Sequence, residues 1–224
     1  MRVCFVNRGT LQRFCEDYGG STADVLFFGF NGADTEISYE KELKGETTYF
    51  EDAAILSKTC KNVVICACVS DTRGLKRKSV VVAEKGKILG VSDMLNCMDG
   101  EYNPGLGLRV YETGVGRIGI CVSEDLYFSE IFRTLSVCGS ETVFCPFYGS
   151  VESAERILIR AAAFSYGAPV CLCASGYAIV ADTDGSALFS SPKSPVEFHL
   201  EQKKEYHLIQ TRKRGFYKRE RTDF

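Results

Sequence analysis

The sequence predicts a single α/β domain in which buried strands alternate with helices. Apolar runs of strand length recur between segments whose hydrophobic residues have helical spacing. The chain has 224 residues, of which 45% are hydrophobic, and a chain of this length buries roughly 70% of its unfolded surface on folding. One segment, residues 116–130 (GRIGICVSEDLYFSE), passes from an apolar strand through a polar turn into a helix.

The expected elements follow one another in alternating order. The chain begins with a strand at residues 2–6 and a short polar helix from Thr10 to Tyr18. Further strands are expected near residues 24–28, 63–69, 79–84, 118–122, 142–145 and 169–174. Helices are expected near residues 48–60, 126–138 and 151–166. Polar and apolar residues alternate over Tyr177 to Phe189 and Glu205 to Thr211, which predicts paired edge strands.

Residues 108–130 have an order of strands, turn and helix that is typical of catalytic sites. We call the passage from the strand at 118–122 into the helix that follows it the joint. Leu108 to Thr113 is expected to be a strand and residues 114–116 a turn. Ile118 to Val122 has few polar residues on either face, which predicts an interior strand. Ser123 and two acidic residues then open a helix, where outward-pointing N–H groups stabilise a developing negative charge.

This joint resembles the nucleophile segment of the nitrilase, or carbon–nitrogen hydrolase, superfamily, which has a pattern like G-[KR]-[IV]-G-x-x-[IV]-C-[YE]-D-[LI]-x-[FY]-P-E. The residues that carry the resemblance are Gly116, Arg117, Ile118, Gly119, Asp125, Leu126, Phe128 and Glu130. In this alignment the family's cysteine nucleophile falls on Ser123, and its proline falls on Ser129.

Other segments extend the resemblance over most of the chain. Residues 23–30 (ADVLFFGF) resemble a strand end that carries the family's general-base glutamate, and place Phe30 there. Residues 87–95 (KILGVSDML) are similar to the segment with the catalytic lysine, and place Ser92 there. Only the accessory glutamate is kept, as Glu101 before Asn103-Pro104-Gly105. The resemblance implies a four-layer αββα sandwich over residues 1–211, followed by a basic tail at residues 212–224.

The substitutions affect one coupled mechanism. In the family the cysteine attacks an amide or nitrile carbon, the glutamate transfers protons, and the lysine stabilises the oxyanion. Phe30 cannot act as a base, and Ser92 supplies no positive charge. Triad members act as a unit, so the resemblance implies a catalytically inactive pseudoenzyme that binds a small amide-like molecule or a partner. The alternative is a divergent amidase-type hydrolase that cleaves non-peptide C–N bonds through Ser123, or through a displaced cysteine, with Glu101.

Cysteine usage favours buried structural thiols. The chain has eleven cysteines, most of them within apolar strands, and it has no C-x-x-C motif. Cys121 is a candidate for a displaced nucleophile, and Cys145, before Pro146 at a strand end, is a candidate for an exposed thiol, although a structural role is favoured for both. Two histidines are too few for a histidine-based zinc site, so we expect no metal. We also expect no cofactor, because the G-x-G-x-x-G match at residues 114–119 opens a strand instead of a helix.

The overall charge disfavours nucleic acid and anionic membranes as partners. The net charge is −2, which gives no overall attraction to nucleic acid or to an anionic membrane. The first residues form a strand without a signal-peptide pattern, and no apolar run is long enough to span a bilayer, so a cytoplasmic location is expected. The basic tail is interpreted as a solvated arm or a dimer contact. The charged cluster Arg73, Lys76, Arg77 and Lys78 is interpreted as a solvated turn.

A homodimer is expected from the resemblance. The family commonly pairs subunits through helices that follow the nucleophile strand, which correspond here to residues 126–138 and 151–166. The apolar positions expected to face a partner across a two-fold axis are Tyr127, Ile131, Phe132, Ile157 and Leu158.

Overall fold

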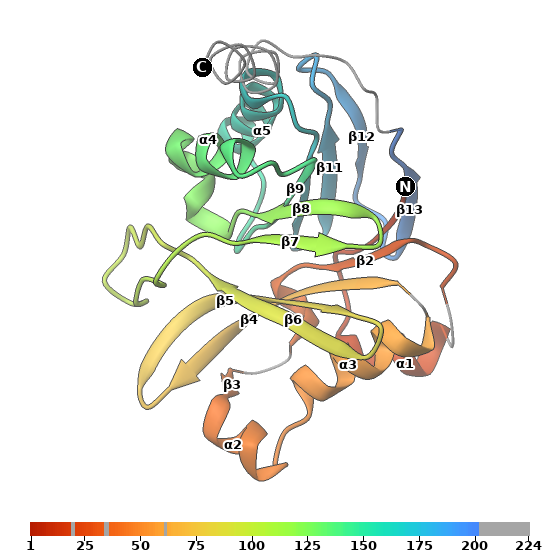
Figure 1. The fold of residues 1–224 in the computed structure, drawn as a ribbon, viewed down its shortest axis with the longest axis vertical. Helices are drawn as coiled ribbons and strands as arrows, with labels where there is room; N and C mark the ends of the chain where they lie inside the picture. Colours follow the sequence, from red (N-terminus) through yellow and green to blue (C-terminus); the bar gives the residue numbers. More distant parts are fainter. Residues whose placement is uncertain (19–20, 34–35, 61, 202–224) are drawn as a thin grey trace, which may run out of the picture.

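The computed structural model describes residues 1–18, 21–33, 36–60 and 62–201. Figure 1 shows two sheets that lie face to face, with helices on both outer sides. The observed architecture is therefore the expected αββα sandwich.

The first sheet has the strand order β13-β1-β2-β4-β5-β6. Its central strands β1 (Arg2–Val6), β2 (Val25–Phe28) and β4 (Val63–Thr72) run parallel. They are flanked by antiparallel strands, namely β5 (Leu75–Glu84), β6 (Lys87–Asp93) and β13 (Val196–His199). The short strand β3 (Ile37–Ser38) pairs with the far end of β4.

The second sheet has the order β12-β11-β10-β9-β8-β7. Strands β8 (Gly116–Ile120), β9 (Thr142–Pro146) and β10 (Val170–Ala174) run parallel. The antiparallel strands are β7 (Val110–Thr113), β11 (Tyr177–Ala181) and β12 (Ala187–Ser191). Strand β8 has a neighbour on each side, which confirms the predicted interior position of the nucleophile-like segment.

Helices cover the two outer faces. The first sheet carries α1 (Leu11–Tyr18), α2 (Tyr39–Lys44) and α3 (Tyr49–Thr59), and the second carries α4 (Ser129–Val137) and α5 (Ser153–Tyr166). Short 3-10 turns, η1 (Phe30–Gly32) and η2 (Ser123–Tyr127), follow β2 and β8. Helix α5 begins with a capping box between Glu152 and Glu155, and ends at Gly167 in the left-handed conformation.

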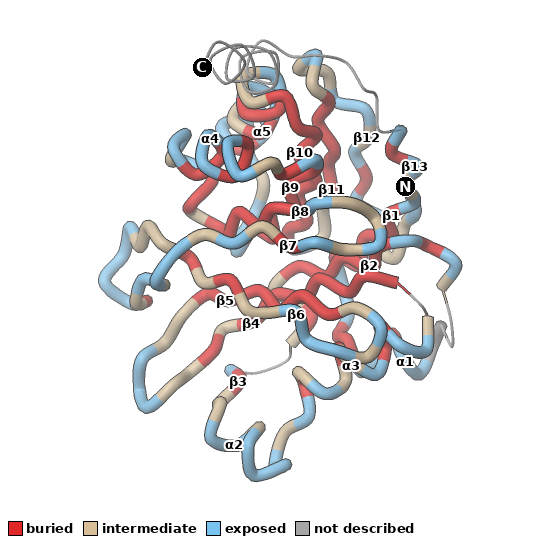
Figure 2. The backbone as a smooth tube through the Cα atoms, viewed as in Figure 1, coloured by how far each residue is buried: buried red, intermediate tan, exposed pale blue. Residues whose placement is uncertain are grey.

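Strand alternation divides the apolar side chains among three cores. Val3 and Phe5 of β1 lie between the two sheets, whereas Cys4 and Val6 face α1 and α3. Across the central core, the Phe27 ring meets the Phe144 ring edge-on at 5.2 Å between centroids. Figure 2 shows the buried residues concentrated in the strands and on the inner sides of the helices.

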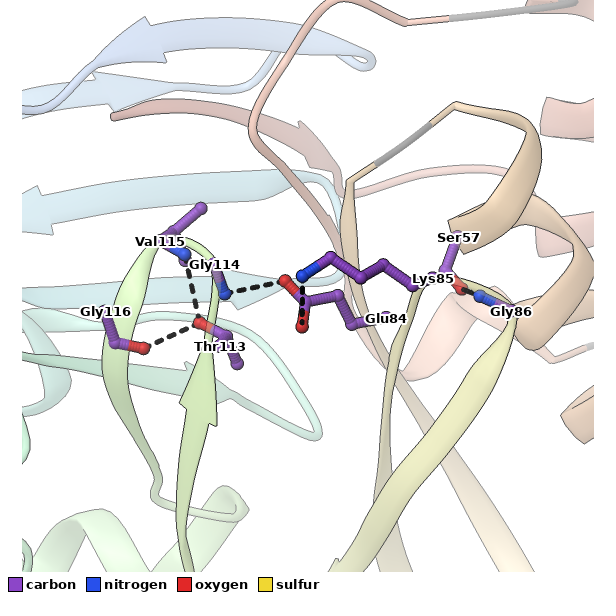
Figure 3. A network of polar contacts seen from close by, with 8 residues as sticks. All are labelled: Ser57, Glu84, Lys85, Gly86, Thr113, Gly114, Val115 and Gly116. Atoms are coloured by element: carbon purple, nitrogen blue, oxygen red, sulfur yellow. Dashed lines mark hydrogen bonds and ion pairs between the residues drawn. The ribbon is translucent and has the colours of Figure 1, made fainter.

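Two hairpin turns join the sheets at one end, as Figure 3 shows. The Gly114 N–H of the β7–β8 turn donates to Glu84 Oε1 at the end of β5, at 2.7 Å. A Cβ on residue 114 would lie 2.8 Å from that oxygen, so the close approach favours glycine. The G-x-G-x-x-G match is thus the start of a hairpin, as its position before a strand predicted.

The helix boundaries agree closely with the sequence-based expectations, but some details differ. Strands β6 and β13, and helix α2, were not predicted, because their short mixed sequences give no clear periodicity. Ile131 and Phe132 are 4% and 2% exposed within the core under α4 and α5. These two side chains stabilise the monomer, so their assignment to a partner surface is wrong. The predicted strand at 205–211 and the basic tail lie outside the described residues.

Within the described ranges, no helix is both long enough and apolar enough to cross a membrane.

Candidate functional site

The candidate site lies where strands of the two sheets end. Phe30 follows β2 in η1, Ser123 follows β8 at the start of η2, and Tyr148 follows β9. The N–H of Phe147 donates to the Cys173 carbonyl at 2.9 Å, and a Cβ on Gly29 would lie 3.3 Å from the same oxygen. The carboxyl ends of β2, β9 and β10 therefore lie close together. Ligands of parallel sheets bind at the carboxyl ends of the strands.

Ser123 occupies a strained and closed position. Its φ is 50°, in the left-handed region that non-glycine residues rarely adopt. The residue is 0% exposed, and its Oγ accepts the Tyr148 N–H at 3.2 Å. The hydroxyl is therefore engaged by the backbone, and a substrate in solvent has no direct contact with it.

Aromatic rings gather at Tyr148, the residue whose N–H binds Ser123. Phe30 is half-buried, and its ring packs edge-on against Tyr148 at 5.2 Å between centroids. The Tyr148 ring also faces the Tyr102 ring at 6.3 Å. Tyr148 itself is 46% exposed, so it forms the outer wall of the site. Burial, then hydrogen bonding to Tyr148 and the nearby Glu101 carboxylate, raise the pKa of Tyr102.

Lys78 enters this site, although the sequence did not single it out as a site residue. It is 1% exposed, and its Nζ forms an ion pair with Glu124 Oε1. The same nitrogen lies over the Tyr102 ring at 4.4 Å and over the Tyr148 ring at 4.8 Å. The second oxygen of Glu124, Oε2, is buried and has no hydrogen-bond partner among the described residues.

The prediction of a solvated turn is wrong for Lys78, and strand register gives the reason. Val80 and Val82 of β5 face the core between the sheets, and Lys78 shares their face by period-2 alternation. Ser92 pairs with Val80, while the Lys78 carbonyl accepts the Met94 N–H at 2.9 Å. Ser92 on β6 and Lys78 on β5 therefore lie on the same face of the sheet. Lys78 is two residues before Val80, the residue that pairs with Ser92. The signal that could have found it is the apolar alternation of β5, extended back to residue 78.

Ser92 and Glu101 have other surroundings. The Ser92 side chain is buried, and its hydroxyl shares a hydrogen bond of 2.8 Å with the Tyr111 hydroxyl. Glu101 is exposed in the loop after β6, close enough to Lys76 to help raise that amine's pKa after the larger effect of Glu36. The structure thus brings Phe30 and Ser123 together on Tyr148, with Glu101 beside Tyr102, whereas Ser92 is bonded to Tyr111.

Asp125 holds the backbone of the joint. Its carboxylate accepts the N–H groups of Leu95 and Asn96, the latter at 2.8 Å, and the Asn96 side-chain amide at 2.9 Å. Burial raises the pKa of Asp125, and these hydrogen bonds oppose the rise. This carboxylate therefore fixes η2 against the loop that leaves β6.

The cysteines near the joint are structural. Cys121 and Cys145 are fully buried in the core beneath α4 and α5, so Cys145 is not the exposed thiol that its position at a strand end suggested. Burial, then the neighbouring Cys145, raise the pKa of the Cys121 thiol, which keeps it in the unreactive protonated form at neutral pH. Among the described residues, no group of histidine, cysteine or acidic side chains is arranged to hold a metal ion.

Comparisons with known proteins agree on the fold. No protein-family model matches the chain, and no curated protein matches its sequence. Solved structures do match, including Nit3 of Saccharomyces cerevisiae, described as a member of branch 10 of the nitrilase superfamily, with a TM-score of 0.71, 16% identity and 88% of each chain covered. A carbon–nitrogen hydrolase of Helicobacter pylori G27 matches with a TM-score of 0.68 and 19% identity, over 88% of this chain and 86% of that one.

An amidase of Nesterenkonia sp. AN1 matches over nearly the whole chain. One of its structures, in which acrylamide has added to the active-site cysteine, has a TM-score of 0.73 and 14% identity, over 98% of this chain and 99% of that one. At these identities the likeness establishes the fold and leaves the chemistry to this chain's own residues.

Proposed function

We propose that this chain uses the nitrilase-superfamily fold for binding and does not hydrolyse carbon–nitrogen bonds. The observation that carries the proposal is the state of Ser123, which is 0% exposed and accepts the Tyr148 N–H. A nucleophile must reach the substrate carbon, and a serine also needs a base that removes its proton.

The groups around Ser123 do not supply that base. Phe30 presents a ring to Tyr148, and the nearest carboxylate along the chain, Glu124, is engaged by Lys78. The Lys78 amine is in turn occupied by this ion pair and by the two tyrosine rings. The alternative with Glu101 as the base is disfavoured by the exposed position of Glu101 in the loop after β6.

A turnover assay tests this proposal. We expect no turnover above background with a panel of glutamine-like amides, short aliphatic amides and nitriles, and equal rates for the wild type and Ser123→Ala. Turnover that disappears in Ser123→Ala would overturn the proposal and support the divergent hydrolase. Circular dichroism of both forms serves as the control that each is folded.

The proposed binding role includes self-association and an amide-like small molecule as candidate interactions. Apolar side chains remain exposed on the layer that contains α4 and α5, namely Tyr127, Val137 and Ile157. Ile157 is 62% exposed, and burial of such side chains between two copies is favourable. We propose a homodimer that uses this layer. We also propose a cytoplasmic location, because all eleven cysteines are free and a reducing compartment keeps thiols in this state.

A further inference from the structure

The group enclosed by Glu124, Tyr102 and Tyr148 is a cation from the chain itself. Lys78 Nζ pairs with Glu124 Oε1 and lies 4.4 Å and 4.8 Å from the centroids of the two tyrosine rings. A carboxylate combined with aromatic faces is a recognition set for an alkylammonium group, because the ring faces and the carboxylate are both negative. We call these three residues the ammonium box.

One acceptor atom of the box, a carboxylate oxygen of Glu124, has no hydrogen-bond donor among the described residues. Glu124 Oε2 is buried and accepts no hydrogen bond among the described residues. A buried carboxylate oxygen without a partner is costly, and an ammonium group with three N–H donors can serve more than one acceptor. The site therefore suits a primary ammonium placed slightly differently from the tethered lysine.

We propose that the ammonium box is a binding site for small primary alkylammonium ions, and that the Lys78 side chain is its resident internal ligand. In the wild type the lysine occupies the box and excludes a free ligand from it. This inference goes beyond the proposed absence of hydrolysis and does not depend on it. It also predicts that an amide-like ligand of the wild type binds outside the box.

Truncation of the lysine tests the proposal directly. Lys78→Ala removes three methylene groups and the ammonium, and these atoms correspond to n-propylammonium. We expect saturable binding of n-propylammonium chloride to Lys78→Ala by isothermal titration calorimetry, with no saturable heat for the wild type at the same concentrations. We expect 1-propanol to bind at least about tenfold more weakly, since it lacks the charge that the carboxylate and rings recognise.

Two variants serve as controls. Lys76→Ala truncates a lysine of the same strand that is 41% exposed and pairs with Glu36, and it should show no binding of n-propylammonium. Lys78→Ala combined with Glu124→Gln should lose at least about tenfold in affinity relative to Lys78→Ala alone. The proposal is overturned if folded Lys78→Ala binds neither compound, binds both equally, or retains its affinity without the Glu124 carboxylate.

A second measurement uses the unaltered chain, in case Lys78→Ala fails to fold. Acetylation with a water-soluble ester, followed by peptide mass spectrometry, ranks the reactivity of the lysines. We expect Lys78 to react at least about tenfold more slowly than Lys76, because Lys78 is enclosed by the box, and Glu124→Gln to narrow this gap. Equal rates for Lys78 and Lys76 in the wild type would contradict the enclosure on which the proposal depends.

Discussion

Removal of Glu124 should destabilise the protein more than removal of Lys78, although the two side chains form one ion pair. The side chain of Lys78 is 1% exposed, whereas that of Glu124 is 17% exposed. In Glu124→Leu the ammonium loses its counterion in a place that water does not reach. In Lys78→Met the carboxylate keeps partial contact with solvent, while methionine fills the space between the tyrosine rings.

The expected magnitudes follow from this asymmetry. Loss of one partner of a buried pair costs about 3–5 kcal/mol, and the retained cation–π contacts with Tyr102 and Tyr148 offset about 0.5 kcal/mol each, or about 1 kcal/mol together. We therefore expect Glu124→Leu to lower the free energy of unfolding by about 2–4 kcal/mol and Lys78→Met by about 1–2 kcal/mol. The double variant should lie within about 1 kcal/mol of the wild type, because apolar residues replace a buried pair with little net loss.

Urea denaturation followed by circular dichroism measures all four forms of this double-mutant cycle. We expect a coupling free energy of at least about 2 kcal/mol between the two positions. A parallel cycle on the exposed pair of Lys76 and Glu36 should give less than about 1 kcal/mol. Additive effects of Lys78→Met and Glu124→Leu, or a larger loss for Lys78→Met, would refute the buried-pair reasoning.

Three further predictions concern the joint and the partner surface. Ile157→Glu should convert the proposed dimer to a 24.8 kDa monomer in sedimentation, whereas Ile55→Glu, at a 53% exposed position on α3, should not; a monomeric wild type would contradict the dimer. The pKa of Asp125 is raised in the fold, which favours its protonated form there. The free energy of unfolding of the wild type should therefore rise relative to that of Asp125→Asn as pH falls through the folded pKa towards 3.8. Wild-type and Asp125→Asn stabilities that change in parallel with pH would contradict this. Ser123→Gly should be more stable in urea than Ser123→Ala by about 1 kcal/mol, because both lose the acceptor for Tyr148 N–H but only glycine relieves the positive φ; the reverse order would refute strain at this position.

The sequence was sufficient for the fold and for the position of the joint. Buried parallel strands are nearly continuous apolar runs, so Ile118 to Val122 could be recognised as interior without knowledge of its neighbours. The short strand β13 could not be recognised in this way. Its four residues alternate between half-buried and exposed, and their pairing with β1 joins segments near opposite ends of the chain.

The site was harder to predict, because the position of Lys78, which pairs with Glu124, depends on the register between β5 and β6. A sequence shows that residue 92 is a serine, but it does not show which side chain of the adjacent strand lies beside it. The pairing of Val80 with Ser92 places Lys78 one pleat further along the same face. The neighbouring basic residues suggested that Lys78 is part of a solvated turn. A lysine can nevertheless lie on the buried face of a strand when a carboxylate such as that of Glu124 pairs with it.

Structural contacts hold the backbone at Ser123 in its left-handed conformation. A positive φ at a serine costs about 1–3 kcal/mol and persists only when surrounding contacts enforce it. Here Asp125 binds two backbone N–H groups of the loop after β6, and the Tyr148 N–H is satisfied by Ser123 Oγ. The same turn connects β8 to α4, so a relaxed backbone would disturb both the central core and the core beneath the helices. Packing and hydrogen bonding alone can therefore maintain the left-handed geometry at Ser123, without any catalytic role for this residue.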